Sequence, residues 1–439
     1  MTLARDVGLY IQPAWPTFPY PEIVQAFLAL RYEPAPCRRA LADIVARHRL
    51  PGHLFDPGAI ERGGLCVTDE LLHGAYQHTA SYVAHRTGPP RSETAILDAS
   101  ELAALGAALR ARRDNGLLAP LYAGDARRAW PTLGPVGVQR REHASVAVRG
   151  RDAAVLVDPI GLAVGIVPGA TPIDCDGAFG AVAITHGHAD HWHAPSVVHQ
   201  AAPLAIVPAV PQTSLMTPED PAVTLRLLGQ NCATPAWGSV VAVGDIEVEV
   251  LPFFGEQATR EAPGPAATIR NWGNCYRFDV PGLSVLVLVD AGRDPAGDAA
   301  AVVADSRARR GPPDLLLASL HEFVTPFTPS CLALPFARQR ELFAELAAGR
   351  LRSMSAGPRG IVELCAASEA RFFLPYADGF SAAGVPERTD WGRGPSEAEV
   401  VAAIGRDLAA AGVATRACTW NPGDCVHPDR GELVVVPYS

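Results

Sequence analysis

The sequence of 439 residues predicts an α/β (α+β) fold in three parts: a helical beginning, a strand-rich centre and a short tail. Three apolar runs, 180–185, 246–251 and 284–289, have the length and the β-branched content of strands. Residues 1–140 instead show the apolar spacing of helices, separated by turns with proline and glycine. We therefore expect a mainly helical N-terminal accessory domain followed by a domain built on strands.

The N-terminal accessory domain, residues 1–140, is predicted from four helical segments. These are Glu22–Tyr32, Arg38–Leu50, Thr68–Arg86 and Ser100–Arg113. Ser100 is a suitable N-cap for the last helix, and Gly116 is a suitable stop. No motif decides the role of this domain, which could be a docking surface for a carrier protein, a lid or the interface of a homodimer.

The central domain, residues 141–385, begins with two short strands joined by a turn, at 143–150 and 153–158. Asp158 ends the second strand and precedes a proline, so we interpret it as a turn residue. Further strands follow, and we expect the central domain to contain the functional site of the protein.

The C-terminal segment, residues 386–439, is predicted to be a helix over Ser396–Ala411 followed by a strand over Glu432–Pro437. Ser396 and Glu399 have the spacing of a capping box, and Gly412 follows the last turn of the helix. We expect this segment to pack back on the central domain.

The segment Thr185–His193, with the sequence THGHADHWH, predicts a metal site at the end of a buried strand. Its metal-binding side chains are His186, His188, Asp190 and His191. The first two histidines alternate in the strand sense and point the same way, and the following turn brings the other two side chains round. Imidazoles suit divalent transition metals, and the carboxylate allows a second ion beside the first.

This H-x-H-x-D-H motif resembles the signature of the metallo-β-lactamase fold superfamily. The resemblance implies an αββα sandwich in which His186 and His188 bind one metal and Asp190 and His191 bind the other. It also implies an aspartate at the end of a later strand that bridges both metals. Asp290, directly after the apolar run 284–289, stands at that place.

A further ligand to the first metal is expected from a loop, and here the sequence departs from most of the superfamily. After the strand 246–251 the chain reads Pro-Phe-Phe-Gly-Glu, so the candidate is Glu256 where a histidine is usual. An anionic oxygen ligand favours iron or manganese over zinc. In this feature the chain resembles the diiron oxygenase branch typified by the chloramphenicol-pathway β-hydroxylase, which acts on an amino acid held by a peptide-synthetase module.

The last metal ligand is left open between two residues. His321 follows a strand at 313–320, and Asp378 follows a strand at 370–375, where the superfamily topology expects the ligand. If His321 does not bind metal, it could still line the pocket as an acid, a base or a substrate contact.

Two functions follow from the resemblance. The first is a non-haem diiron, O₂-dependent oxygenase or hydroxylase of secondary metabolism, with two Fe ions and an amino-acid-like or carrier-bound substrate. Its electrons would come from an external donor, because no nicotinamide, flavin or iron–sulfur motif is present. The alternative is a zinc- or manganese-dependent hydrolase of the lactonase, esterase, amidase or phosphodiesterase type, in which Asp190 orients the attacking hydroxide.

Composition limits the partners and the compartment. The formal net charge of −9 argues against nucleic acid, and no apolar run is long enough to span a membrane. The nine cysteines are dispersed without a C-x-x-C pair, as is typical of reduced thiols in a cytoplasmic protein. The first residues lack the apolar core of a signal peptide, so we expect a cytoplasmic enzyme.

Overall fold

In the computed structural model of the protein, the described residues fall into eleven main ranges. These are 7–13, 33–48, 78–84, 91–114, 136–159, 179–211, 219–255, 271–322, 353–377, 395–429 and 432–437, without 142, 189 and 295, and with shorter pieces inside 22–31 and 337–350.

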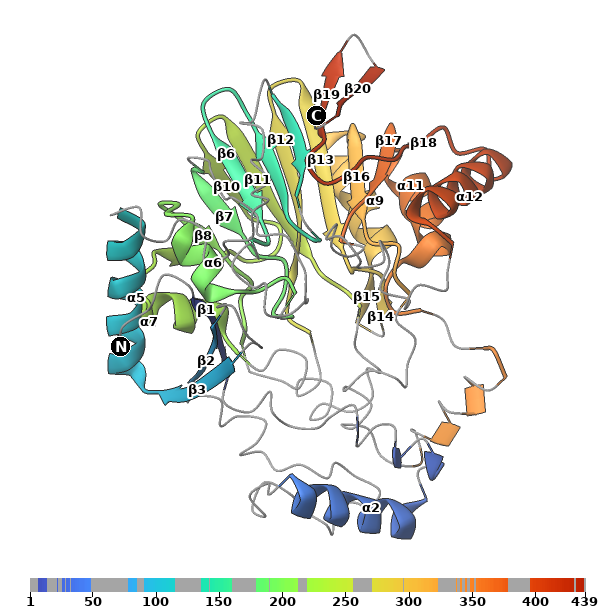
Figure 1. The fold of residues 1–439 in the computed structure, drawn as a ribbon. Helices are drawn as coiled ribbons and strands as arrows, with labels where there is room; N and C mark the ends of the chain where they lie inside the picture. Colours follow the sequence, from blue (N-terminus) through green and yellow to red (C-terminus); the bar gives the residue numbers. More distant parts are fainter. Residues whose placement is uncertain are drawn as a thin grey trace.

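Two β-sheets face each other across the core (Figure 1). The seven-stranded sheet has the order β10 (Val240–Val243), β11 (Ile246–Pro252), β12 (Asn274–Val280), β13 (Leu283–Val289), β16 (Leu315–Ala318), β17 (Phe372–Pro375) and β18 (Arg416–Ala417). The eight-stranded sheet has the order β20 (Glu432–Val436), β19 (Cys425–Asp429), β4 (Gly137–Arg140), β5 (Val146–Arg149), β6 (Ala154–Val157), β7 (Ala181–Ala183), β8 (Ala205–Ile206) and β9 (Cys232–Ala233). Apolar side chains from the facing strands, such as Val148 and Val250, form one continuous buried cluster between the sheets.

Helices cover the outer face of each sheet and complete the αββα layers (Figure 1). The helices on the seven-stranded sheet are α9 (Ala299–Arg310), α11 (Gly357–Ser368) and α12 (Glu397–Ala410). Those on the eight-stranded sheet are α5 (Ala99–Asp114), α6 (Ala194–His199) and α7 (Pro221–Leu227). Leu286 and Leu288 of β13 are fully buried together with the alternating Val285 and Val287, because both faces of this strand are covered.

The N-terminal segment contains a β-sheet that the sequence analysis did not predict. Its strands β1 (Val7–Pro13), β2 (His78–Ala84) and β3 (Arg91–Leu97) form an antiparallel sheet. The predicted helix Thr68–Arg86 is therefore wrong over 78–84, where β-branched and aromatic residues pair with strands on both sides and override the helical spacing. Among the described residues of this segment, α2 (Pro34–Arg47) and α5 are helices, and the described residues Glu22, Ala26, Phe27 and Ala29 of the predicted helix Glu22–Tyr32 are also helical.

Helix α5 begins one residue earlier than predicted. Its N-cap is Asp98 instead of Ser100, because Asp98 Oδ1 accepts the backbone N–H groups of Ser100 and Glu101 at 2.8 and 2.9 Å. Glu101 in turn accepts the N–H of Asp98 at 2.9 Å. Leu102 and Leu105 then pack into the cluster on the outer face of the eight-stranded sheet, so this helix serves the sandwich although it precedes it in sequence.

The C-terminal segment contributes strands to both sheets. The capping box of Ser396 and Glu399 is present at the start of α12, as the spacing predicts. After this helix, β18 joins the seven-stranded sheet, while β19 and β20 join the eight-stranded sheet beside β4. A buried ion pair of 2.8 Å between Arg140 of β4 and Glu397 of α12 links the same two regions.

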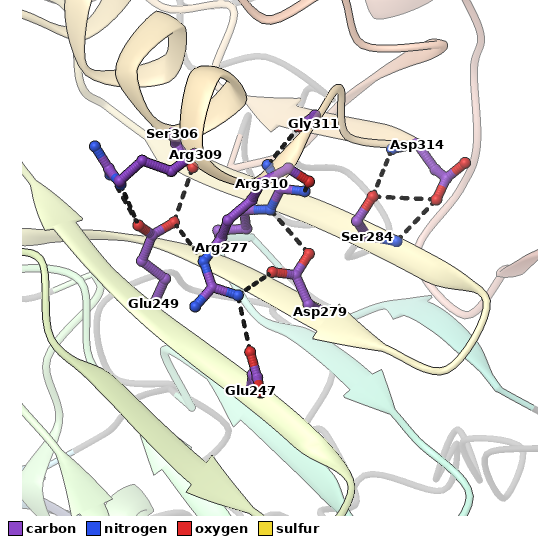
Figure 2. A network of polar contacts seen from close by, with 10 residues as sticks. All are labelled: Glu247, Glu249, Arg277, Asp279, Ser284, Ser306, Arg309, Arg310, Gly311 and Asp314. Atoms are coloured by element: carbon purple, nitrogen blue, oxygen red, sulfur yellow. Dashed lines mark hydrogen bonds and ion pairs between the residues drawn. The ribbon is translucent and has the colours of Figure 1, made fainter.

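A polar network fixes α9 on the seven-stranded sheet (Figure 2). Glu249 of β11 is 2% exposed and accepts hydrogen bonds from Ser306 and Arg309 of the helix, both at 2.8 Å. Arg277 of β12 donates to the carbonyl oxygen of Gly311 at 2.8 Å, just beyond the helix end.

Among the described residues, no helix combines the length and the apolar character that a membrane crossing requires.

Candidate metal centre

The H-x-H-x-D-H loop leaves β7 at the edge of the sandwich and turns back on itself. Thr185 accepts the N–H of Asn274 through its carbonyl at 2.7 Å, so the loop starts as an extension of the sheet toward β12. The carbonyl oxygen of His188 then accepts the N–H groups of His191 and Trp192 at 2.9 and 2.7 Å. This tight turn brings the rings of His186 and His191 to a centroid distance of 4.1 Å.

Asp290 lies where the bridging aspartate is expected. Its Oδ2 atom is 3.6 Å from Nε2 of His186 and 3.3 Å from Nε2 of His191. The same oxygen therefore lies close to both His186 and His191. Its position follows from β13, which ends at Val289 with a positive φ of 49° and turns the next side chain toward the loop.

Two groups of three side chains could each hold a metal ion. One is His186, His188 and Asp290, and the other is His143, Asp190 and His191. In each group the donor atoms lie within 4.8 Å of one another. The sequence analysis assigned five of these residues to the metals and missed His143.

The distances fit a metal ion. Donor atoms at about 2.1 Å from a tetrahedral ion lie about 3.4 Å from each other. The four distances between donor atoms that relate His143, His186, Asp190, His191 and Asp290 range from 3.0 to 3.8 Å. Moreover, Nε2 of His186 is fully buried without a hydrogen-bond partner, as expected of a nitrogen reserved for a metal.

The electrostatics of the site favour cations. Burial lowers the pKa of His186 well below its usual value, so this ring is neutral and presents a lone pair. Burial would also lower the pKa of His191, but the carboxylates of Asp190, Asp158 and Asp290 outweigh it and raise that pKa well above its usual value. Three aspartates around one imidazole carry more negative charge than a single proton balances, and divalent ions would balance it.

Asp158 is not the simple turn residue that the sequence suggested. It is fully buried and accepts hydrogen bonds from the Thr185 N–H at 2.7 Å and the Thr185 hydroxyl at 2.5 Å. It also lies 3.1 Å from Nδ1 of His191. A carboxylate behind a metal-binding histidine fixes its tautomer and leaves Nε2 for the ion. The prediction failed because β6 and β7 are parallel neighbours, and their ends meet only in the folded protein.

His143 is the residue that the sequence analysis overlooked as part of the site. It lies in the turn between β4 and β5, with a side chain that is 6% exposed, and its Nε2 is 3.0 Å from Oδ2 of Asp190. Nothing in the local sequence signals this role, because a single histidine in a turn has no motif. Its place depends on the antiparallel pairing of β4 with β5.

Two predicted ligands, Glu256 and Asp378, lie outside the described residues. The residues just before them do approach the site. Gly255 has φ of 138°, and a Cβ atom added to it would lie 3.3 Å from the backbone oxygen of Asp290. The N–H of Ala377 donates to the carbonyl oxygen of His143 at 3.1 Å. Both ligand assignments stay predictions.

His321, the other candidate for the last ligand, follows β16. Its backbone is held by Ser319 and Ser355, since its N–H donates to the Ser319 hydroxyl at 3.1 Å and its carbonyl accepts the Ser355 hydroxyl at 2.7 Å. In the part of the chain that the structure describes, neither of the two groups suited to a metal includes it. Its role as a ligand or a pocket residue stays a prediction.

Comparisons with known proteins agree with the fold. Residues 138–325 match the family model of a beta-lactamase superfamily domain. No curated protein matches the chain in sequence.

Among solved structures, a variant of the CmlA β-hydroxylase aligns over 100% of both chains at 14% identity, with a TM-score of 0.56. CmlA itself, a diiron β-hydroxylase from Streptomyces venezuelae, aligns over 95% of this chain and 98% of its own at 14% identity, with a TM-score of 0.54. Igni18, a metallo hydrolase from Ignicoccus hospitalis, covers 69% of this chain and 99% of its own at 13% identity, and its TM-score of 0.41 is too low to support an argument. Residues 138–325 thus resemble a beta-lactamase superfamily domain, and the chain has the metallo-β-lactamase fold.

Proposed function

We propose that this protein is a non-haem diiron oxygenase that hydroxylates an amino-acid-like or carrier-bound substrate. The observation that carries the proposal is the whole-length likeness in fold to a diiron β-hydroxylase, including the N-terminal segment. The candidate site supports it, since the described donors suffice for two ions and include two carboxylates at the metals, Asp190 and Asp290.

The described residues could hold two ions between them. His186 and His188 would hold the first, Asp190 and His191 the second, and Asp290 both. Glu256 and Asp378, as predicted ligands, would add carboxylate oxygens that favour iron. Two iron ions held in this way would supply the activation of O₂ that hydroxylation of a C–H bond requires.

The shape of the site suggests how a substrate arrives. His186, His191 and Asp290 are at most 4% exposed, whereas the side chain of Asp190 is 43% exposed. Protein covers the ligand side and excludes water there, so we infer that the substrate approaches from the flank of Asp190.

The overall reaction would be R–H + O₂ + 2 e⁻ + 2 H⁺ → R–OH + H₂O. The two electrons would come from an external donor protein, because the sequence contains no cofactor motif of its own for electron delivery. A ferredoxin- or flavodoxin-type partner would fit this need.

A zinc- or manganese-dependent hydrolase is the second candidate. The exposed carboxylate of Asp190 favours it, because an ionised aspartate at the open flank can orient a water molecule for attack on an ester, lactone, amide or phosphodiester. In that case the same ligands would hold two ions without redox change.

Metal analysis with matched activity assays tests the proposal. The protein is stripped of metal and loaded separately with Fe(II) or Zn(II). The chemically reduced iron form should consume O₂ and change its visible absorption, while the zinc form should leave a panel of p-nitrophenyl esters, lactones and phosphodiesters intact. A zinc form that hydrolyses one of these esters, together with an iron form that is inert to O₂, would contradict the oxygenase and support the hydrolase.

A further inference from the structure

We propose that His143 is a protein ligand of the second metal ion, through Nε2, in addition to Asp190 and His191. The proposal rests on the dinuclear site of the proposed function, but it is independent of which metal is bound and of which reaction follows.

The backbone of His143 holds its ring toward the site. The turn between β4 and β5 is closed by a 2.8 Å hydrogen bond from the Arg141 N–H to the Ser145 carbonyl. His143 itself has a positive φ of 50°, which residues with side chains seldom adopt. Its carbonyl accepts the N–H of Ala377 at 3.1 Å, so the segment that follows β17 fixes the turn from the other side. Such a conformation persists only where the surroundings determine it.

The donor atoms converge as they do around one ion. Nε2 of His143 is 3.0 Å from Oδ2 of Asp190, and that oxygen is 3.8 Å from Nε2 of His191. These two distances bracket the separation of about 3.4 Å expected for neighbouring ligands of a tetrahedral ion. All three donor atoms lie within 4.8 Å of one another.

If His143 only supported Asp190 from behind, its ring nitrogen would be expected on the side of Asp190 that faces away from the other donor atoms. Asp158 illustrates such a role, since it contacts Nδ1 of His191 while Nε2 of that ring is the nitrogen close to Asp290. His143 instead presents its nitrogen on the same side as the donor atoms of Asp190 and His191. The ring of His143 is 6% exposed, close to the 1% of His191, which withdraws its nitrogen from bulk water.

The assignment changes the ligand count of the site. The second ion would have two imidazole nitrogens, from His143 and His191, and two carboxylates, from Asp190 and the bridging Asp290. These are four protein donors, as many as a tetrahedral ion takes, and Asp378 would be a fifth where the bound ion accepts more. His321 would then not be needed as a ligand of the second ion.

Loading the protein with Co(II) alone tests the proposal without any assay of activity. Wild-type protein should bind two Co(II) ions per chain, whereas His143→Gln should bind one tightly and the second more than about 100-fold more weakly. Each imidazole bound through Nε2 has an N–H proton that the paramagnetic ion shifts in the NMR spectrum. The His143→Gln spectrum should lack one such exchangeable resonance.

Two further variants make the outcome unambiguous. His143→Asn tolerates the positive φ and should show the same loss, while circular dichroism checks the fold. His48→Gln, on the exposed end of α2, should keep both ions and all the resonances. If His143→Gln and His143→Asn retain two ions and every shifted resonance, His143 only hydrogen-bonds to Asp190 and the proposal is overturned. Wild-type protein that binds a single ion would overturn both this assignment and the dinuclear site.

Discussion

Replacement of Asp158 by asparagine should weaken metal binding although this residue touches no metal. The carboxylate accepts three hydrogen bonds in a fully buried place: one from the Thr185 N–H at 2.7 Å, one from the Thr185 hydroxyl at 2.5 Å, and one from Nδ1 of His191 at 3.1 Å. An asparagine has one acceptor oxygen, so at least one of these donors would face an amide NH₂. A buried donor without an acceptor costs about 1–3 kcal/mol. The positive φ of 43° is not a reason for the loss, since asparagine tolerates it.

Two measurements separate the effects of Asp158→Asn. The free energy of unfolding of the metal-free protein in urea should fall by about 1–3 kcal/mol. The affinity for Zn(II), measured by competition with a chelator, should fall about 10- to 100-fold, because His191 loses the partner that fixes its tautomer.

Asp245→Asn is the matched control for Asp158→Asn. Asp245 also accepts two hydrogen bonds, from the N–H groups of Arg151 and Asp152 at 2.7 and 3.1 Å, but it lies in an exposed turn away from the metal centre. Its substitution should leave the affinity for Zn(II) unchanged. If Asp158→Asn matches wild type in both affinity and stability, the assignment of Asp158 as the support of His191 is wrong.

Three further predictions address the ligands and one buried acid. Asp290→Asn should reduce metal content to at most one ion per chain with unchanged far-UV circular dichroism, because an amide is neutral and has a donor at one end; two retained ions would refute the bridge. Glu256→Ala should weaken or remove one ion in metal analysis, and unchanged metal content would mean that this residue is not a ligand. Burial raises the pKa of Glu219 from 4.5 to about 7, although hydrogen bonds from Thr224 and Trp192 oppose it. The stability that this acid contributes when protonated is present below pH 4.5 and is lost as the pH rises to about 7. In urea titrations, the free energy of unfolding of Glu219→Gln should therefore rise by about 3 kcal/mol relative to that of wild type between these two pH values. Parallel pH profiles of the two proteins would contradict this prediction.

Much of the central domain could be predicted from local patterns. The run 284–289 became β13 and the run 246–251 became β11, because continuous or alternating apolar residues suit strands with two or one buried faces. The H-x-H-x-D-H loop and Asp290 came together as the resemblance implied, since each directly follows a strand end at the same edge of the sandwich.

The N-terminal segment could be predicted less well. The segment 78–84 has enough helical spacing to suggest a helix, yet it lies between two partner strands in an antiparallel sheet. Hydrogen bonds to residues far away in sequence decide such cases, and no local window contains them.

The sequence by itself determined the candidate metal-binding loop, the strand that precedes Asp290 and the fold class, because these depend on residues close together in the chain. Only the tertiary structure decided that His143 and Asp158 join the site. Each is a single polar residue at a turn, and its neighbours in space come from other strands. The parallel pairing of β6 with β7 and the hairpin of β4 and β5 create these contacts, so no motif in the chain could announce them.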